Sequence, residues 1–213
     1  MKIDFFEEDH SYLLNQVPTP SITRMLGDEG ITSFEFCSEQ DRNRGSAVHK
    51  IASLIGSTPW QGSTPEEIVA NSRWDPYSTN PVLVPYGFGL ARFYLDKKFR
   101  PTLMEQPVGS ERYGICGTLD QYGEAETSQG IKRWLVEFKS GRPLPGAHIQ
   151  SALYSFCLKE TLGLETDERV VVWLKSDGDY QAYPARPDGG VDLAVGLAAV
   201  SVWKWRTQHK RFD

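Results

Sequence analysis

The sequence predicts an α/β fold with a mixed central β-sheet, flanked by helices and preceded by an N-terminal β-hairpin and a helical segment. Two observations support this prediction. Helical spacing of apolar residues occurs at 34–56 and 86–99, and three strand patterns then follow one another over residues 102–139. A helical pattern and two more strand patterns come next, an order typical of a sheet with helices on its faces.

The N-terminal part begins with a hairpin. Residues 3–18 alternate short apolar groups with polar turns, which favours two antiparallel strands. Ser21 follows a proline and suits the N-cap of a short helix. Residues 34–56 predict a longer helix, with His49 beside its apolar stripe and Gly56 at its end. That stripe consists of Val48, Ile51, Ala52 and Ile55.

A long polar connection separates this helix from the next one. Residues 57–84 are rich in Ser, Thr, Pro, Asn and Gly, with room for one short helix at 65–71. Residues 86–99 again show helical spacing.

The second half of the chain supplies the sheet. The predicted elements are strands at 102–108, 112–123 and 131–139, a helix at 147–162 closed by Gly163, strands at 169–175 and 180–185 around a turn at Asp177-Gly178, and a helix at 190–209. The polar segment 124–130 is expected to connect the second and third strands. We expect one domain over residues 1–213, with a hairpin and helices to residue 100, the sheet and its helix at 101–185, and a C-terminal helix at 186–213.

Composition restricts the possible classes of protein. No apolar run is long enough to cross a bilayer, and acids interrupt the N-terminus where a signal peptide needs an apolar stretch. We therefore expect a protein of the cytoplasm, the host cytoplasm if a phage encodes it, without a membrane partner. Three scattered cysteines, Cys37, Cys116 and Cys157, are one short of a four-cysteine cluster, so reduced thiols and no iron–sulfur cluster are expected.

The net charge of −5 argues at first against a nucleic-acid partner. Acids that hold divalent cations weaken that objection, because the bound metal restores positive charge locally. The segment 204–211 is basic, and we interpret it as a solvated helix end, with a DNA contact as the alternative.

The chemistry is concentrated in one predicted hairpin. In the strand that ends at Lys139, the side chains of Glu137 and Lys139 project on the same face, opposite to Phe138. If the turn lies near Ser128, antiparallel pairing brings Asp120 opposite Glu137 or one diagonal away. Taken singly, these residues are also compatible with a surface ion pair and a turn acid.

Two adjacent carboxylates repel each other on a half-buried sheet, and a divalent cation between them removes that cost. Oxygen ligands of this kind suit Mg²⁺ or Mn²⁺, one ion or two, which can acidify a water molecule and polarise a phosphodiester. Lys139 could then orient that water or neutralise charge on the phosphorane.

Two further segments fit such a site. Gln150 and Tyr154 share one face of a helix whose first turn follows the strand, where free N–H groups suit a phosphate. Arg44 and His49 lie near the start of the predicted N-terminal helix. The alternatives are an ordinary helix with a buried tyrosine and a structural histidine.

Taken together, these residues resemble the RecB-like branch of the PD-(D/E)XK nucleases. Its ordered motifs R-G-x-x-x-H, G-x-x-D, E-x-K and Q-x-x-x-Y are matched by Arg44–His49, Gly117–Asp120, Glu137–Lys139 and Gln150–Tyr154. The segment Val17–Thr23 is similar to an N-terminal element of phage and CRISPR-associated members. The similarity covers residues 10–175 and implies a restriction-endonuclease-like core.

The resemblance implies roles for individual residues. His49, Asp120 and Glu137 would bind the metal with the main-chain carbonyl of Phe138, and Lys139 would serve the attacking water. The resemblance further implies that Arg44, Gln150 and Tyr154 shape the site and touch DNA, and that Glu105 is an additional acid, with a rim glutamate as the alternative.

Two departures from the family pattern narrow the expectation. Leu119 stands where the superfamily has its proline, which is common in the RecB-like branch, and the cluster cysteines of several relatives are missing. The resemblance therefore implies an exonuclease of phage or bacterial DNA recombination or repair, similar to lambda exonuclease. Its partners would be DNA and a single-strand annealing protein or helicase, and a homo-oligomer is compatible with the family. The alternatives are a catalytically silent DNA-binding module on the same fold, or another phosphohydrolase with carboxylate-bound metal.

Overall fold

The computed structural model describes residues 1–32, 38–59, 63–75, 77–186 and 190–209. Its helices are α1 (Ile22–Asp28), α2 (Glu39–Gly56), α3 (Pro65–Asn71), α4 (Val84–Lys97), α5 (Gly146–Leu162) and α6 (Val191–Gln208), with a 3-10 turn at Tyr77–Thr79. Its strands are β1 (Ile3–Phe6), β2 (Ser11–Leu14), β3 (Val17–Thr19), β4 (Arg100–Ser110), β5 (Ile115–Thr127), β6 (Gly130–Lys139), β7 (Glu168–Leu174) and β8 (Tyr180–Pro184).

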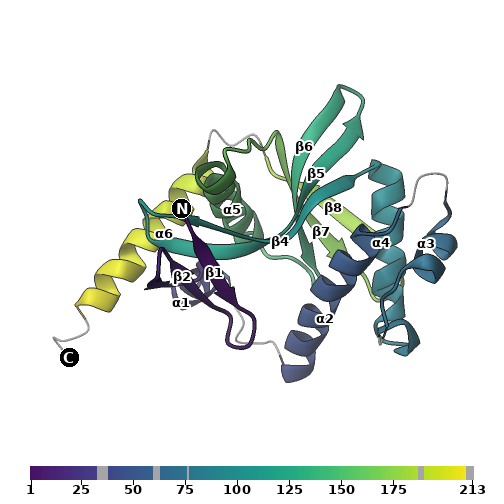
Figure 1. Ribbon diagram of the computed structural model, residues 1–213, viewed down its shortest axis with the longest axis horizontal. Coiled ribbons are helices and arrows are strands. Elements are labelled where there is room, and N and C mark those ends of the chain that lie inside the picture. Colours follow the sequence, from purple (N-terminus) through teal and green to yellow (C-terminus); the bar gives the residue numbers. More distant parts are fainter. Residues whose placement is uncertain (33–37, 60–62, 76, 187–189, 210–213) are drawn as a thin grey trace.

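A five-stranded sheet in the order β4-β5-β6-β7-β8 forms the centre of the molecule (Figure 1). β6 and β7 pair in parallel through the α5 crossover, and the other neighbours are antiparallel. The predicted α/β class, with a mixed sheet between helices, is confirmed. Among the described helices, none is long and apolar enough to cross a membrane.

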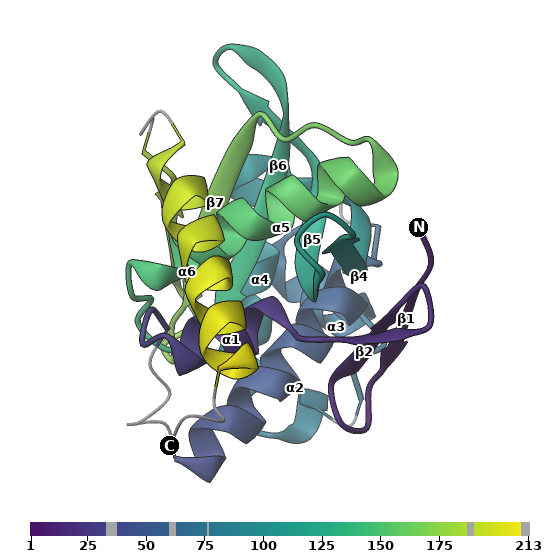
Figure 2. The ribbon, with the colours of Figure 1, turned by 90° about the vertical axis from the view of Figure 1, so that its left-hand side faces the viewer.

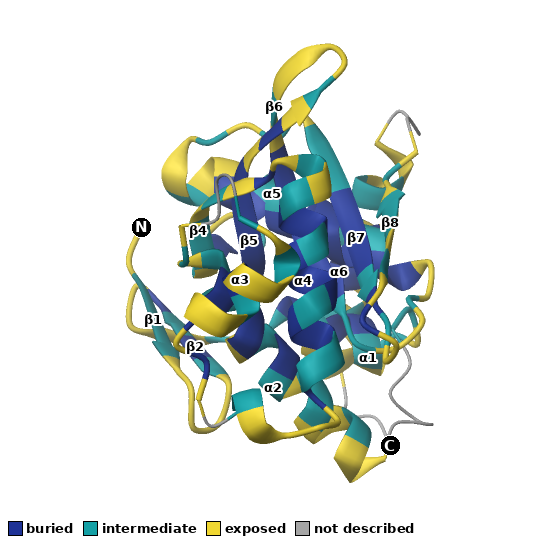
Figure 3. Ribbon diagram, turned by 90° about the vertical axis from the view of Figure 1, so that its right-hand side faces the viewer, coloured by how far each residue is buried: buried dark blue, intermediate teal, exposed yellow. Residues whose placement is uncertain are grey.

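The two faces of the sheet bury separate apolar clusters. On one face, Val136 and Phe138 pack with residues of α2 and α4, including the predicted stripe of α2. On the other face, Leu135 packs with α5, α6 and α1, and Figure 2 shows α6 lying outside α5. In Figure 3 the buried residues gather on the central strands and the inner faces of the helices.

Local signals explain where the helices begin and end. Ser21 caps α1 as predicted, accepting a hydrogen bond from the Arg24 N–H. A capping box between Ser38 and Asp41 starts α2. Gly163 ends α5 with φ +69°, in the left-handed region that glycine tolerates.

Two expectations about the strands need correction. The N-terminal hairpin carries a third strand, β3, which pairs with β2. Pro18 fits there because β3 is an edge strand, where a missing N–H costs little. The segment 124–130 is not a connection, since β5 and β6 pair as far as Thr127 and Gly130. Buried and exposed side chains still alternate in this segment, since Ala125 is buried between two exposed residues. Glu124 pairs in register with Arg133, an opposite charge that favours the pairing.

Candidate functional site

Three neighbouring strands bring three acids into one row across the sheet. The pairs Met104–Gln121 and Gln106–Leu119 leave Glu105 of β4 facing Asp120 of β5. The register between β5 and β6, continued by one residue, sets Asp120 opposite Glu137. Asp120 is 5% and Glu137 1% exposed, so two carboxylates are buried side by side, as the hairpin predicted.

The strands are irregular where these acids lie. Side chains of a regular strand alternate between the two faces of the sheet, so Leu119 and Tyr122 should point to opposite faces. Both instead pack on the α5 side, which shows that the alternation of β5 shifts by one residue near Asp120. Glu105 has φ +46°, a backbone conformation that non-glycine residues rarely adopt and that costs on the order of 1–3 kcal/mol. The Phe138 N–H donates to Asp120 Oδ2 at 2.7 Å, so a side chain replaces a ladder bond between the strands.

Helix α2 adds a nitrogen to this row. Packing of its apolar stripe on the sheet places His49 Nδ1 at 3.0 Å from Asp120 Oδ1 and at 3.9 Å from Glu105 Oε1. One ligand atom from each of these three residues lies within 4.8 Å of the others, the spacing of a candidate cation site. His49 is therefore brought to the site from far upstream, as the resemblance implied.

Glu137 and Lys139 form the inner end of the site. Lys139 Nζ donates to Glu137 Oε1 at 2.8 Å and to Gln150 Oε1 at 3.2 Å. Glu137 Oε2 is buried and has no hydrogen-bond partner. A buried carboxylate oxygen without a partner is costly, and a cation would satisfy it. The donor set thus fits a hard divalent ion such as Mg²⁺ or Mn²⁺.

Helix α5 supports Lys139 through a polar network. Gln150 Nε2 donates to the Tyr154 hydroxyl at 3.0 Å and to Thr23 Oγ1 at 3.1 Å, and Thr23 lies 3.2 Å from the Tyr154 oxygen. The Tyr154 ring also accounts for Gly117 in the G-x-x-D motif, because a Cβ there would lie 2.5 Å from the ring. Thr23 was not predicted as a site residue, although it closes the Val17–Thr23 segment that the resemblance singled out.

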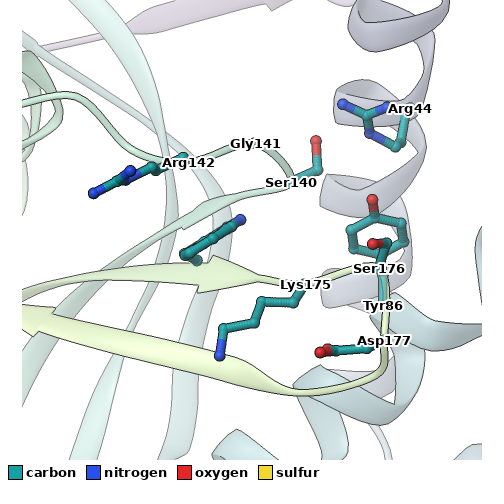
Figure 4. A pocket seen from close by; sticks show the side chains of 9 residues that line it. Arg44, Tyr86, Ser140, Gly141, Arg142, Lys175, Ser176 and Asp177 are labelled. Atoms are coloured by element: carbon teal, nitrogen blue, oxygen red, sulfur yellow. The ribbon is translucent and has the colours of Figure 1, made fainter.

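A pocket with three basic side chains and one acid, Asp177, lies where β6 and β7 end, and Ser140, the neighbour of Lys139, also lines it. Arg44 on α2 lines it together with Arg142, which follows β6, and Lys175, which follows β7 (Figure 4). Trp173 lines the same pocket and is paired in register with Lys139. Arg44 also forms an ion pair with Asp41 at 2.8 Å, and its buried Nε has no hydrogen-bond partner. Sequence reasoning found Arg44 but missed the others, because they come together only through the parallel pairing of β6 and β7.

The electrostatics of the site reflect crowded negative charge. Burial, and then the charge of Asp120, raises the pKa of Glu137 to about 7 and also raises the pKa of Glu105. Burial opposes protonation of His49, but the charge and hydrogen bond of Asp120 outweigh it and raise the pKa of His49 to about 9. Burial likewise opposes the charge on Lys139, but Glu137 raises the lysine pKa, so this side chain stays an ammonium ion.

Neither of the two described cysteines belongs to the candidate ligand group of this site. Cys116 and Cys157 are buried free thiols, and burial raises the pKa of both. Cys37 lies outside the described residues. The absence of an iron–sulfur cluster stays a prediction.

Comparison with known proteins gives limited information. No family model and no curated protein matches the sequence. Similar solved structures include an alkaline exonuclease, LHK-Exo, from Laribacter hongkongensis, with 13% identity, a TM-score of 0.42, and coverage of 79% of this chain and 93% of that one. The complex of LHK-Exo with dAMP has 13% identity and a TM-score of 0.42, and covers 76% of this chain and 87% of that one. A similarity of this degree assigns no family.

A divalent metal should stabilise the protein more at alkaline than at acidic pH. Because the folded-state pKa of Glu137 is raised from 4.5 to about 7, the metal-free protein loses stability as pH rises through that range. A cation that binds the ionised acids restores it. At a hundredfold excess over Kd, one site adds about 2.7 kcal/mol, or about 5–10 °C in Tm for a chain of this size.

Differential scanning fluorimetry with and without Mn²⁺ at pH 5.5 and 8 measures this effect. Asp120→Ala should abolish the shift, whereas Glu66→Ala, at an exposed acid on α3, should keep it. An equal shift at both pH values, or none, would contradict the expected protonation of the site.

Proposed function

We propose that this chain is a metal-dependent DNA nuclease with a PD-(D/E)XK active site of the RecB-like type, carried by a single domain. The proposal rests above all on one observation, the row of Glu105, Asp120 and Glu137 with His49 at one end and Lys139 at the other. The four motifs of the resemblance supply most of these residues, and Glu105 is the additional acid that some members share.

His49, Asp120 and Glu105 offer ligand atoms within 4.8 Å of one another and would hold the metal. Glu137 and the Phe138 carbonyl are the further ligands that the resemblance implies, and the unpartnered Glu137 Oε2 fits that role. A bound Mg²⁺ or Mn²⁺ supplies a water molecule acidified toward neutral pH and polarises the phosphodiester. Glu105, at 40% side-chain exposure, is the most exposed acid of the row, and a second ion would contact it more readily than Asp120 or Glu137.

Lys139 acts as a fixed positive charge in this scheme. The charges of Glu137 and Asp120 raise its pKa, which favours the ammonium form, and in that form it would donate hydrogen bonds to the attacking water or to the phosphorane oxygens. Gln150 Oε1 holds the ammonium group in place by accepting a hydrogen bond from it, and Tyr154 and Thr23 fix Gln150 in turn. A preorganised donor of this kind contributes most when charge develops in the transition state.

The basic pocket supports DNA as the substrate despite the net charge of −5. Arg44, Arg142 and Lys175 line it together with Ser140, which follows Lys139 in the chain, and guanidinium and ammonium groups bind phosphates by charge-assisted hydrogen bonds. Together with the resemblance, this arrangement favours an exonuclease of phage or bacterial recombination or repair, working with a single-strand annealing protein or a helicase.

Two alternatives remain testable against this proposal. A silent DNA-binding module is disfavoured because every acid of the row and Lys139 are present. Another metal-dependent phosphohydrolase would not require the Lys139–Gln150 contact. Activity on p-nitrophenyl phosphate together with inactivity on DNA would favour this second alternative.

Linear double-stranded DNA should be degraded in the presence of Mg²⁺ or Mn²⁺, and excess EDTA should abolish the degradation. End-labelled linear DNA and closed circular DNA, compared on gels, measure the activity and its requirement for an end. Asp120→Asn serves as the inactive control, since it removes the central carboxylate while keeping its size. Cutting that persists in excess EDTA would refute metal dependence.

Lys139→Met should lower kcat by a factor of about 10² or more, because a donor to the developing charge is lost. The variant should still bind metal, since the lysine is not a ligand. The rise in its Tm on addition of Mn²⁺ measures this binding. Lys132→Met on the same strand is the matched control and should leave kcat unchanged. Near-normal turnover of the Lys139 variant would remove this residue from the chemistry.

His49→Ala should raise the metal concentration for half activity, more severely with Mn²⁺, which tolerates a nitrogen ligand better than Mg²⁺ does. The wild-type midpoint should also rise at acidic pH, because imidazole must lose its proton to coordinate a metal. Titrations of both metals decide the matter, with His10→Ala as control. An unshifted midpoint, with only a lower Tm, would make His49 a structural residue.

A further inference from the structure

Helix α6 is apolar on the side that faces away from the molecule. Its inner face, including Gly196, Ala199 and Val200, is buried against α5 and α1. Its outer face exposes Val191, Val195, Val202 and Trp205, four of the twelve exposed large hydrophobic residues among the described positions. A helix on a protein surface normally presents polar residues to solvent. Apolar residues on both sides are typical of a helix that packs between two partners.

The exposed residues form a regular line, here called the outer stripe. Val191, Val195, Ala198, Val202 and Trp205 follow spacings of four, three, four and three residues. This is the alternation of a and d positions along a helix that packs against another helix. All five side chains are exposed in the chain as it stands, so no part of the described molecule covers the stripe.

We propose that the outer stripe joins two copies of this chain through an antiparallel α6–α6 contact. This inference is independent of the proposed nuclease function. With a two-fold axis near Val200, Val195 faces Trp205 of the second copy and Ala198 faces its Val202. Each layer then pairs a larger side chain with a smaller one, which allows the helices to interdigitate. The same patch serves both copies, as an isologous contact requires.

Charge favours the antiparallel arrangement. Asp192 lies in the first turn of α6 and Arg206 in the last. Both already form ion pairs within the chain, with Arg169 and Glu29 respectively. Antiparallel helices place the acidic end of one copy beside the basic end of the other and also oppose the helix dipoles. A parallel pair would instead bring like charges together.

The shape of the molecule leaves room for the second copy. Figures 1 and 2 show α6 at the outside of the fold, with its C-terminal half extending away from the central sheet. The site described above is built from α2, α5 and the strands, and the outer stripe faces away from α5. Pairing through α6 therefore leaves each site open, and the two copies should act independently.

One helix pair is a small interface, at the weak end of specific association. Sedimentation velocity of the full chain over roughly a hundredfold range of micromolar concentration should show a monomer–dimer equilibrium. Added salt should not weaken the dimer, because apolar contact carries it and screening reduces repulsion between copies of charge −5.

Val202→Glu should raise the dissociation constant at least about tenfold, since the contact would bury a carboxylate. Val202 is 48% exposed, so the circular dichroism spectrum should be unchanged, and so should Tm at concentrations where both proteins are monomeric. Val82→Glu makes the same change at an exposed valine outside α6 and should leave the dimer intact. Cleavage per site should be equal in the wild-type protein and the Val202 variant.

Cysteine cross-linking tests the geometry. Ala198→Cys combined with Val202→Cys should form disulfide-linked dimers, whereas Val195→Cys alone should not, because its two copies would lie far apart along antiparallel helices. The wild-type chain, which keeps its own cysteines, gives the background. A monomer at every concentration, vesicle binding by a monomeric chain, or efficient cross-linking through Val195→Cys alone would each overturn the proposal.

Discussion

The hydrogen bonds to Asp120 are the interaction on which the rest of the site depends. Its carboxylate accepts the Phe138 N–H at 2.7 Å and lies 3.0 Å from His49 Nδ1, so it ties β5 to β6 and α2 to the sheet. A side chain that takes over a ladder bond lets the strands depart from regular pairing. The shift in alternation at Asp120 and the left-handed backbone of Glu105 lie across from each other in the register of β4 and β5.

Several interactions that lower the stability of the fold lie close together around Asp120. Buried acids repel one another, one buried carboxylate oxygen lacks a partner, and one residue adopts a strained backbone. Such interactions persist only where the surroundings enforce them. Here two apolar clusters, one on each face of the sheet, hold the strands in place. A divalent cation would turn the same acids into ligands, so the structure is strained in a way that binding relieves.

Much of the fold could be predicted from the sequence because its signals are local. Periodicity predicted the helices and most strands, and one well-placed turn was enough to set Asp120 beside Glu137. The alternation shift at Asp120 and the backbone of Glu105 could not be predicted, since a strand pattern assumes regular pleating. Thr23, Arg142 and Lys175 were missed because each reaches the site through tertiary packing, without a spacing of its own.

The exposure of the side chains differs along the row and would decide how a substrate reaches the proposed site. Glu137 is 1% exposed and Gln150 5%, whereas the side chains of His49 and Glu105 are 31% and 40% exposed. Glu137 is therefore the enclosed member of the row, whereas the Lys139 side chain next to it is 28% exposed, so the row is open to solvent on both sides of Glu137. Arg44 lies five residues before His49 on α2 and lines the pocket that Ser140, the neighbour of Lys139, also lines. The side chains that would bind a substrate and those that would act on it thus come from α2 and from one end of the sheet, whose relative position the packing of the α2 stripe fixes.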